Sequence, residues 1–314
     1  MFNFKKHTTP AYPKEVVTDL DDLMRFEFLV QSGKLLPSHP VYSMLAGGHA
    51  SKLRGRGLDF EEVRQYVAGD DIRNIDWKVT ARTGKTQSKV FNEEKERPTF
   101  IVADQSSAMF FGSQHFVKSV SVAHIAAISA FYTVKRGDRV GGIVFNEEGY
   151  DFILPRRSKA QVQHLLQAIV ARNAKLPERK VVVPNTDLLN TMLQKTVAGV
   201  THDYVIIVIS DFSAINEETR KYLRNMSQHN DVILAHIYDR MDQSLPDGKI
   251  ILSDGKHQIN WRNNKHSWGQ KYTSSFTDIQ HKLTEEFNRY RIPIVFFNTE
   301  EAVDDQILHA MGKR

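Results

Sequence analysis

The sequence contains no cysteine, which excludes disulfide bonds, thiolate metal sites and a cysteine nucleophile. An apolar leader segment is also missing from its start, and no apolar run reaches the roughly 20 residues that a membrane span needs. These absences predict a cytoplasmic protein that does not insert into a membrane.

The sequence also lacks a strong excess of positive or negative charge. The 314 residues include 42 Lys and Arg against 37 Asp and Glu, so the net charge of +5 is a small surplus on a nearly balanced surface. The basic residues are scattered in pairs, such as Lys5-Lys6, and are not gathered into a stripe. Because nucleic-acid affinity depends on clustered Lys and Arg, the composition does not favour a nucleic-acid-binding protein.

The common catalytic motifs are absent as well. None of the 13 histidines has the H-E-x-x-H spacing of a zinc hydrolase, and no G-x-S-x-G nucleophile turn occurs. Gly84-Lys85-Thr86 resembles the end of a phosphate-binding loop, but Val79 stands where that loop needs its first glycine. We therefore expect a non-enzymatic protein.

The chain does contain a hydrophobic fraction of 41%, and from residue 99 onward strand-like segments alternate with helix-like ones. Apolar residues at helical spacing over residues 113–135 predict a helix that lays one face on a sheet, and a later helix is predicted over residues 277–290. Two short strands, 140–145 and 150–154, predict an antiparallel pair. The predicted fold class is α/β, with a Rossmann-like, mostly parallel sheet flanked by helices.

Three segments of the chain differ in composition. Residues 1–46 predict an extended tail followed by a helix over residues 19–31, which opens on an acidic run. Residues 47–98 are polar and glycine-rich, and their short alternating pieces predict a small β-rich appendage of strands and turns. Residues 99–314 carry the α/β domain, which includes a hairpin predicted over residues 249–261.

Two strand-like runs end in an aspartate, the first in Asp104 and the second in Asp211. Parallel strands present their carboxyl ends at one edge of a sheet, so both carboxylates should lie above the same crevice, where oxygen ligands suit Mg²⁺. The two aspartates could instead anchor their own loops through hydrogen bonds. Thr186 precedes a helix-like segment, so its hydroxyl could either cap that helix or face the metal.

This arrangement is similar to the von Willebrand factor A domain, in which a D-x-S-x-S loop, a threonine and a distant aspartate form a metal-ion-dependent adhesion site. The matching residues are Asp104, Ser106, Thr186 and Asp211. Ala108 stands in place of the second serine, and Phe212 follows the last aspartate where this family commonly has glycine. The resemblance implies a Mg²⁺ site, weakened by the lost hydroxyl, whose open coordination position accepts a carboxylate from a partner protein.

Residues 55–82 carry a more specific pattern, G-x-G-x-x-F-E-E-x-R-x-Y followed by G-D-D-x-R-x-I-D-W-K, with A-R-T-G-K at its end. This signature closely resembles the family called domain of unknown function fifty-eight, and the resemblance runs over about residues 48–298. Members carry the signature ahead of a von Willebrand A-like domain. They are typically encoded beside MoxR-type AAA+ ATPases, which implies a chaperone-like pair that matures or assembles other protein complexes.

The charged and aromatic residues of this signature have two interpretations. They are Asp70, Arg73, Asp76, Trp77 and Arg82. Because Arg binds a carboxylate through two parallel hydrogen bonds, the opposite charges could form a network around the tryptophan that holds the appendage against the main domain. The same residues could instead bind a partner, since interfaces are enriched in Trp and Arg.

The leading hypothesis is therefore a non-enzymatic adaptor that binds client proteins and a MoxR-type AAA+ ATPase through the loop face bearing Asp104. The alternative is a metal-assisted hydrolase or phosphoryl-transfer enzyme, in which the two aspartates hold Mg²⁺ and orient a water or a phosphate. The sequence names neither the client nor the oligomeric state.

Overall fold

The chain forms two compact units. The small unit comprises residues 49–96, and the large unit comprises residues 1–48 and 97–314. The tail predicted for the start of the chain falls largely on residues 1–11, outside the described part. The computed structural model describes residues 12–33, 59–92, 96–178, 186–213, 215–244, 249–253, 258–262 and 266–310.

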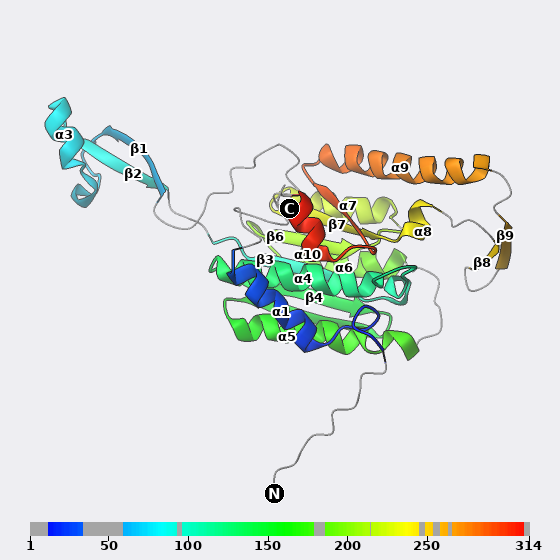
Figure 1. The fold of residues 1–314 in the computed structure, drawn as a ribbon. Helices are drawn as coiled ribbons and strands as arrows, with labels where there is room; N and C mark the ends of the chain where they lie inside the picture. The colour runs from blue at the N-terminus through cyan, green and yellow to red at the C-terminus, as the bar shows by residue number, and fades with distance from the viewer. Residues whose placement is uncertain are drawn as a thin grey trace, which may run out of the picture. The chain divides into compact units, whose positions relative to one another are not determined.

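The large unit is built around one six-stranded sheet with the strand order β10-β7-β6-β3-β4-β5. Its inner strands β7, β6, β3 and β4 are labelled in Figure 1. β5 runs antiparallel to β4, and the other neighbouring strands of this sheet are parallel. The predicted α/β class with a mostly parallel sheet is therefore confirmed, as is the antiparallel pair. The strands are β3 (Thr99–Asp104), β4 (Val140–Asn146), β5 (Gly149–Arg156), β6 (Val205–Ser210), β7 (Asp231–Tyr238) and β10 (Ile294–Asn298).

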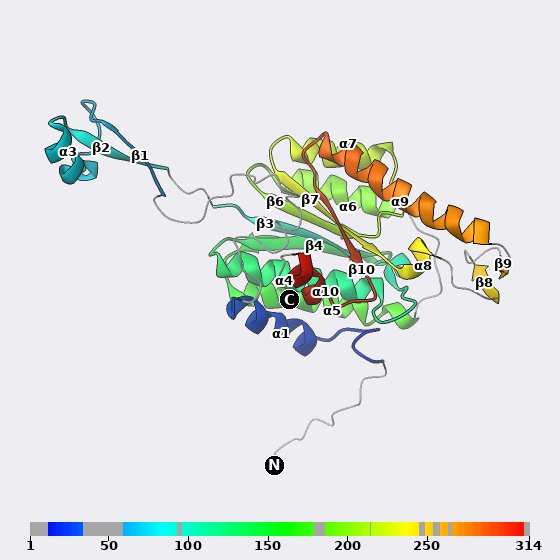
Figure 2. The ribbon, with the colours of Figure 1, turned by 45° about the horizontal axis from the view of Figure 1, so that its top comes forward.

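Helices cover both faces of this sheet, as the turned view shows (Figure 2). Because successive residues of a strand point to opposite faces, Ile101 and Ile207 pack toward α1, α4, α5 and α10, whereas Val102 and Val208 pack toward α6, α7 and α9. Each face therefore has its own apolar core. The helices are α1 (Leu20–Gln31), α4 (Lys118–Lys135), α5 (Lys159–Asn173), α6 (Thr186–Gly199), α7 (Glu217–Ser227), α8 (Arg240–Gln243), α9 (His266–Asn288) and α10 (Val303–Ala310).

The central helix α4 packs one face on the sheet, as predicted, and its other sides are buried as well. Its residues from Lys118 to Thr133 are all buried. α4 also begins later than the predicted residue 113. The side away from the sheet is covered by α1 and α5, which pack directly on α4. The spacing of the apolar residues predicts which face of α4 packs on the sheet, but it does not predict the helices that cover the other faces of α4.

Helix α1 begins close to the predicted residue 19, with Asp19 as its amino-terminal cap. The side chain of Asp19 accepts a hydrogen bond of 2.7 Å from the backbone N–H of Asp22. We expect Asp19→Ala to lower the free energy of unfolding by about 1 kcal/mol, because that N–H loses its partner. Urea unfolding followed by circular dichroism measures the change. Asp21→Ala is the control, since this exposed residue lies in the same turn and caps nothing, and an equal loss in both variants would contradict the assignment.

The small unit contains a two-stranded antiparallel sheet of β1 (Asp59–Gln65) and β2 (Gln87–Asn92). A short 3-10 helix (Ile72–Asn74) and helix α3 (Trp77–Thr83) lie between these strands in the sequence. We predicted only strands and turns here, so α3 was missed.

The start and stop signals of α3 are nevertheless present in the sequence. The side chain of Asp76 accepts hydrogen bonds from the N–H groups of Lys78 (3.0 Å) and Val79 (3.1 Å). Gly84 ends the helix at φ 68°, a left-handed conformation that favours glycine. An aspartate and a glycine flanking a seven-residue helix are the usual caps of a short helix.

Near the carboxyl end, β8 (Lys249–Ser253) and β9 (Gln258–Arg262) form the predicted hairpin, whose turn lies outside the described residues. α9 begins at His266, well before the predicted residue 277. Among the helices that the structure describes, none combines the length and the apolar character needed to cross a membrane.

Candidate functional site

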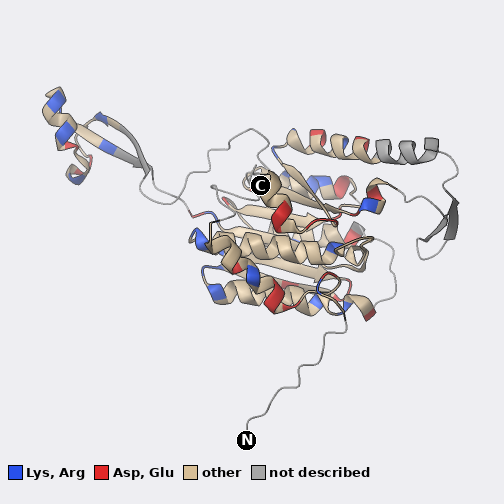
Figure 3. Ribbon diagram, in the orientation of Figure 1, with Lys and Arg blue, Asp and Glu red and all other residues tan. Residues whose placement is uncertain are grey.

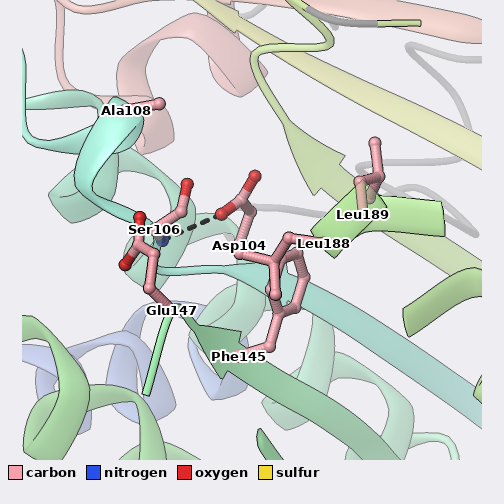
Figure 4. Close-up of a pocket in the computed structure, with 7 residues that line it drawn as sticks. All are labelled: Asp104, Ser106, Ala108, Phe145, Glu147, Leu188 and Leu189. Carbon is pink, nitrogen blue, oxygen red and sulfur yellow. Dashed lines mark hydrogen bonds between the residues drawn. The ribbon is translucent and has the colours of Figure 1, made fainter. Parts of the chain in front are cut away.

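Asp104 lies at the carboxyl end of β3, as predicted, and is 6% exposed. One carboxylate oxygen accepts a hydrogen bond of 2.9 Å from the backbone N–H of Ser106, the bond drawn in Figure 4. The other accepts a hydrogen bond of 2.7 Å from the hydroxyl of Ser210, the last residue of the neighbouring strand β6. The carboxyl group therefore ties together the ends of two central strands.

Burial dominates the electrostatics of this carboxyl group. It raises the pKa of Asp104 from 3.8 to about 6, because the charged form loses its hydration. This value already includes the hydrogen bonds from Ser210 and Ser106, which lower the pKa, and the nearby charge of Asp211, which raises it. Near pH 6 about half of the molecules carry a neutral carboxyl group at this position.

The cavity beside Asp104 has a volume of about 30 Å³. This is room for one or two water molecules, whereas sites for small organic ligands occupy roughly 300 Å³ or more. A carboxylate oxygen of Glu147 accepts hydrogen bonds from the N–H (2.7 Å) and hydroxyl (2.6 Å) of Ser107. The lining residues are Asp104, Ser106, Ala108, Phe145, Glu147, Leu188 and Leu189 (Figure 4).

Asp211 follows the end of β6, as predicted, but its side chain faces a lysine. One carboxylate oxygen lies 3.4 Å from the ammonium of Lys118, and the other accepts a hydrogen bond of 3.1 Å from the N–H of Ser213. The next residue, Phe212, has a φ of 47°, the left-handed conformation that glycine adopts most easily. Its side chain is buried in the core on the α6 and α7 face, which offsets a backbone strain of about 1 kcal/mol.

The four predicted metal ligands are only partly brought together. Asp104 and Ser106 line one small cavity, which Ala108 also lines with a methyl group in place of a hydroxyl. Thr186 is the first residue of α6, and its side chain lies outside the described part of the structure. Asp211 pairs with Lys118.

These residues fit a hydrated Mg²⁺ poorly. The ion requires about six oxygens and usually keeps several waters, for which a cavity of about 30 Å³ has no room. Each oxygen of Asp104 accepts one hydrogen bond, and the charge of Asp211 is paired with an ammonium. Within the described residues, no three His, Asp or Glu side chains gather into a metal-binding group.

The signature residues of the small unit do not form the predicted network with one another. Asp70 pairs with Arg64 at 2.8 Å, Arg73 pairs with Asp71 at 3.0 Å, and Asp76 lies 3.5 Å from Lys89. In each of these pairs one partner, Arg64, Asp71 or Lys89, is a residue that the predicted network did not include. Trp77 is 69% exposed and Arg82 is also exposed, so the tryptophan is not an anchor at the centre of these charges.

Several further residues at the same edge of the large sheet were not predicted from the sequence. Asp239 is buried after β7 and accepts hydrogen bonds from the hydroxyls of Ser113 (2.5 Å) and Thr299 (2.6 Å). Asp239 stands at the end of an apolar strand, as Asp104 and Asp211 do. The same sequence pattern could therefore have identified Asp239. His236 is buried in β7, and burial lowers its pKa from 6.5 to about 4. No pattern in the sequence marks His236 or Lys118.

A second hollow, of about 430 Å³, lies near the amino ends of β6 and β7. It is lined by charged residues of both signs, among which Arg97 and Asp231 lie 2.6 Å apart. The ring of His202 and the carboxylate of Asp203 form a hydrogen bond of 2.9 Å. This hollow therefore offers no concentrated charge to a ligand.

Comparison with known proteins identifies related sequences of unknown function. The model of the family described as "Protein of unknown function DUF58" matches residues 62–279. Uncharacterized proteins of Mycobacterium tuberculosis and Mycobacterium bovis are 28% identical to this chain over 251 residues, which cover 79% of this chain and 76% of each relative.

The solved structures found by comparison are more distant. The conserved hypothetical protein BatB from Bacteroides thetaiotaomicron has a TM-score of 0.41 at 13% identity, over 69% of this chain and 97% of its own. An aerotolerance-related membrane protein from Bacteroides fragilis has a TM-score of 0.36 at 15% identity, over 69% of this chain and 100% of its own. At these values the likeness carries no information about activity or partners.

Proposed function

This chain belongs to the family described as protein of unknown function DUF58, and on that premise we propose that it is a non-enzymatic adaptor that binds other proteins. Its partner in this proposal is a MoxR-type AAA+ ATPase, and the pair acts like a chaperone in maturing or assembling protein complexes in the cytoplasm. The proposal locates the docking surface on the small unit, around α3.

The observation that carries the proposal is the exposure of large apolar side chains on the small unit. Val67, Ile72 and Trp77 are 59%, 67% and 69% exposed. Across residues 63–89, the stretch of this unit whose burial the structure describes, the one buried residue is Ser88. Exposed aromatic and aliphatic groups on a small element are typical of protein-binding surfaces.

The charges around α3 indicate what kind of segment would bind there. The carboxylates of Asp70 and Asp71 pair with nearby arginines, and Asp76 both caps α3 and lies near a lysine. The exposed Lys78 and Arg82 of α3 form no ion pair with the described residues, and Figure 3 shows basic residues along this helix. A partner segment with acidic side chains flanking an apolar residue would complement such a surface.

Trp77→Ala tests the proposed docking surface. We expect the variant to weaken binding to the purified MoxR-type ATPase by about 30-fold or more, because an interface tryptophan commonly contributes about 2 kcal/mol or more. Surface plasmon resonance measures the dissociation constant, and circular dichroism checks that the variant is folded.

Phe28→Ala is the matched control, since Phe28 is an aromatic residue of α1 that is 76% exposed in the large unit. This control should bind like the wild type. Equal affinity of the Trp77 variant and the wild type would remove the docking surface from the proposal, and no binding by the wild-type protein would remove the partner.

A further inference from the structure

Lys118, the first residue of α4, carries a buried ammonium group at the carboxyl edge of the large sheet. Its side chain is only 7% exposed. The ammonium lies 2.7 Å from a carboxylate oxygen of Asp242 and 3.4 Å from one of Asp211. The ammonium also lies over the face of the Phe111 ring, 5.8 Å from its centroid. A lysine is almost never buried unless it is paired, so these contacts account for its position.

The two carboxylates come from different strand ends of the sheet. Asp211 follows β6, and Asp242 lies in α8, which follows β7. Asp242 is itself fixed, because its carboxylate accepts a hydrogen bond of 2.8 Å from the N–H of Asp239. The ammonium therefore connects the loop after β6, the turn after β7 and the first turn of α4.

We infer that the ammonium of Lys118 is the cation held at the carboxyl edge of the large sheet and that it takes the place of a divalent metal ion. Asp211 is the predicted metal ligand that follows β6, and the ammonium of Lys118 neutralises its charge. A metal ion at Asp211 would have to displace Lys118, leaving a buried ammonium with Asp242 alone. This inference concerns the large unit and stands whether or not α3 binds a partner.

Direct metal binding to the wild-type protein tests the inference. Mn²⁺, which favours the same oxygen ligands as Mg²⁺, is titrated and the free ion is measured by electron paramagnetic resonance. We expect no saturable binding at millimolar concentrations. Saturable binding that disappears in Asp104→Asn would overturn the inference, because it would place an ion beside Asp104 while Lys118 is present.

Removing the ammonium gives the complementary test. We expect Lys118→Met to lower the Tm by about 10 °C, because two carboxylates lose a buried partner. Adding Mg²⁺ should recover part of this loss, and combining Lys118→Met with Asp211→Asn should recover part of it without Mg²⁺. Lys159→Met is the matched control, because Lys159 also has a 2.7 Å ion pair, with Glu27, but is 58% exposed; its Tm should change little.

The outcomes separate clearly. A Tm of Lys118→Met equal to that of the wild type would refute the role of the ammonium. If the variant does not fold, the wild-type Mn²⁺ titration still decides whether a divalent ion binds at this edge.

Discussion

Asp104→Asn is expected to stabilise the protein at pH 8 by up to about 3 kcal/mol and to leave its stability at pH 4 nearly unchanged. Folding raises the pKa of Asp104 from 3.8 to about 6, so the folded protein binds more protons than the unfolded chain between these values. The stabilisation that this proton provides is complete below pH 3.8 and is lost as the pH rises through about 6. A permanently neutral side chain avoids that loss.

Asparagine can also keep the hydrogen bonds of this position. Its carbonyl oxygen can accept from the N–H of Ser106, and its amide group can donate to the hydroxyl of Ser210, which now acts as the acceptor. Urea unfolding by circular dichroism at several values from pH 4 to pH 8 gives the difference between variant and wild type. A variant that is less stable than the wild type at pH 8 would show that the carboxylate is needed in its charged form.

His236→Phe is expected to produce the opposite dependence on pH. The pKa of His236 is lowered to about 4, mainly by burial and also by the nearby charge of Lys118, while the charges of Asp211 and Asp242 act in the opposite direction. The unfolded chain therefore binds more protons than the folded protein between about pH 4 and pH 6.5. Stability from this residue is complete above pH 6.5 and is lost as the pH falls through 4, by about 3 kcal/mol.

Phenylalanine cannot ionise, so His236→Phe should be about 3 kcal/mol less sensitive to acid than the wild type over this interval. The replacement is an aromatic side chain between two others, because the ring of His236 lies 5.8 Å from that of Phe212 and 5.1 Å from that of Phe296. The same unfolding series measures the effect. An acid sensitivity equal to that of the wild type would show that His236 titrates normally in the folded protein.

The two variants are most informative together. The contributions of Asp104 and His236 have similar size and opposite sign between pH 4 and pH 6, so they largely cancel in the wild type. In each single variant, the free energy of unfolding should change with pH as the remaining residue, His236 or Asp104, dictates. In the double variant, the remaining dependence on pH should resemble that of the wild type, and a deviation measures the coupling of the two groups through Asp211, which acts on both.

The sequence predicted those structural features that are determined by residues close together in the chain. A strand ending in aspartate predicted the positions of Asp104 and Asp211, because an apolar run followed by a carboxylate marks the end of a buried strand. The acidic run at Asp19 predicted the start of α1. These features depend on residues within a few positions of one another in the chain.

The partners of these residues depend on the assembled fold and could not be predicted. Lys118 lies 93 residues from Asp211 in the sequence, and Ser210 lies 106 residues from Asp104. Nothing around Lys118 distinguishes it from a solvated lysine at the start of a helix. The resemblance to a metal site predicted that a cation belongs beside Asp211, but the tertiary structure supplies it as an ammonium group.

The strand order of the large sheet has a consequence for its assembly during synthesis. β3 emerges first and lies at the centre, with β4 and β5 added in turn on one side and β6, β7 and β10 in turn on the other. Each new strand therefore joins an open edge, and none has to enter between strands that are already paired. The sheet can grow outward as the ribosome releases the chain, although β3 keeps one unpaired edge until β6 has left the exit tunnel.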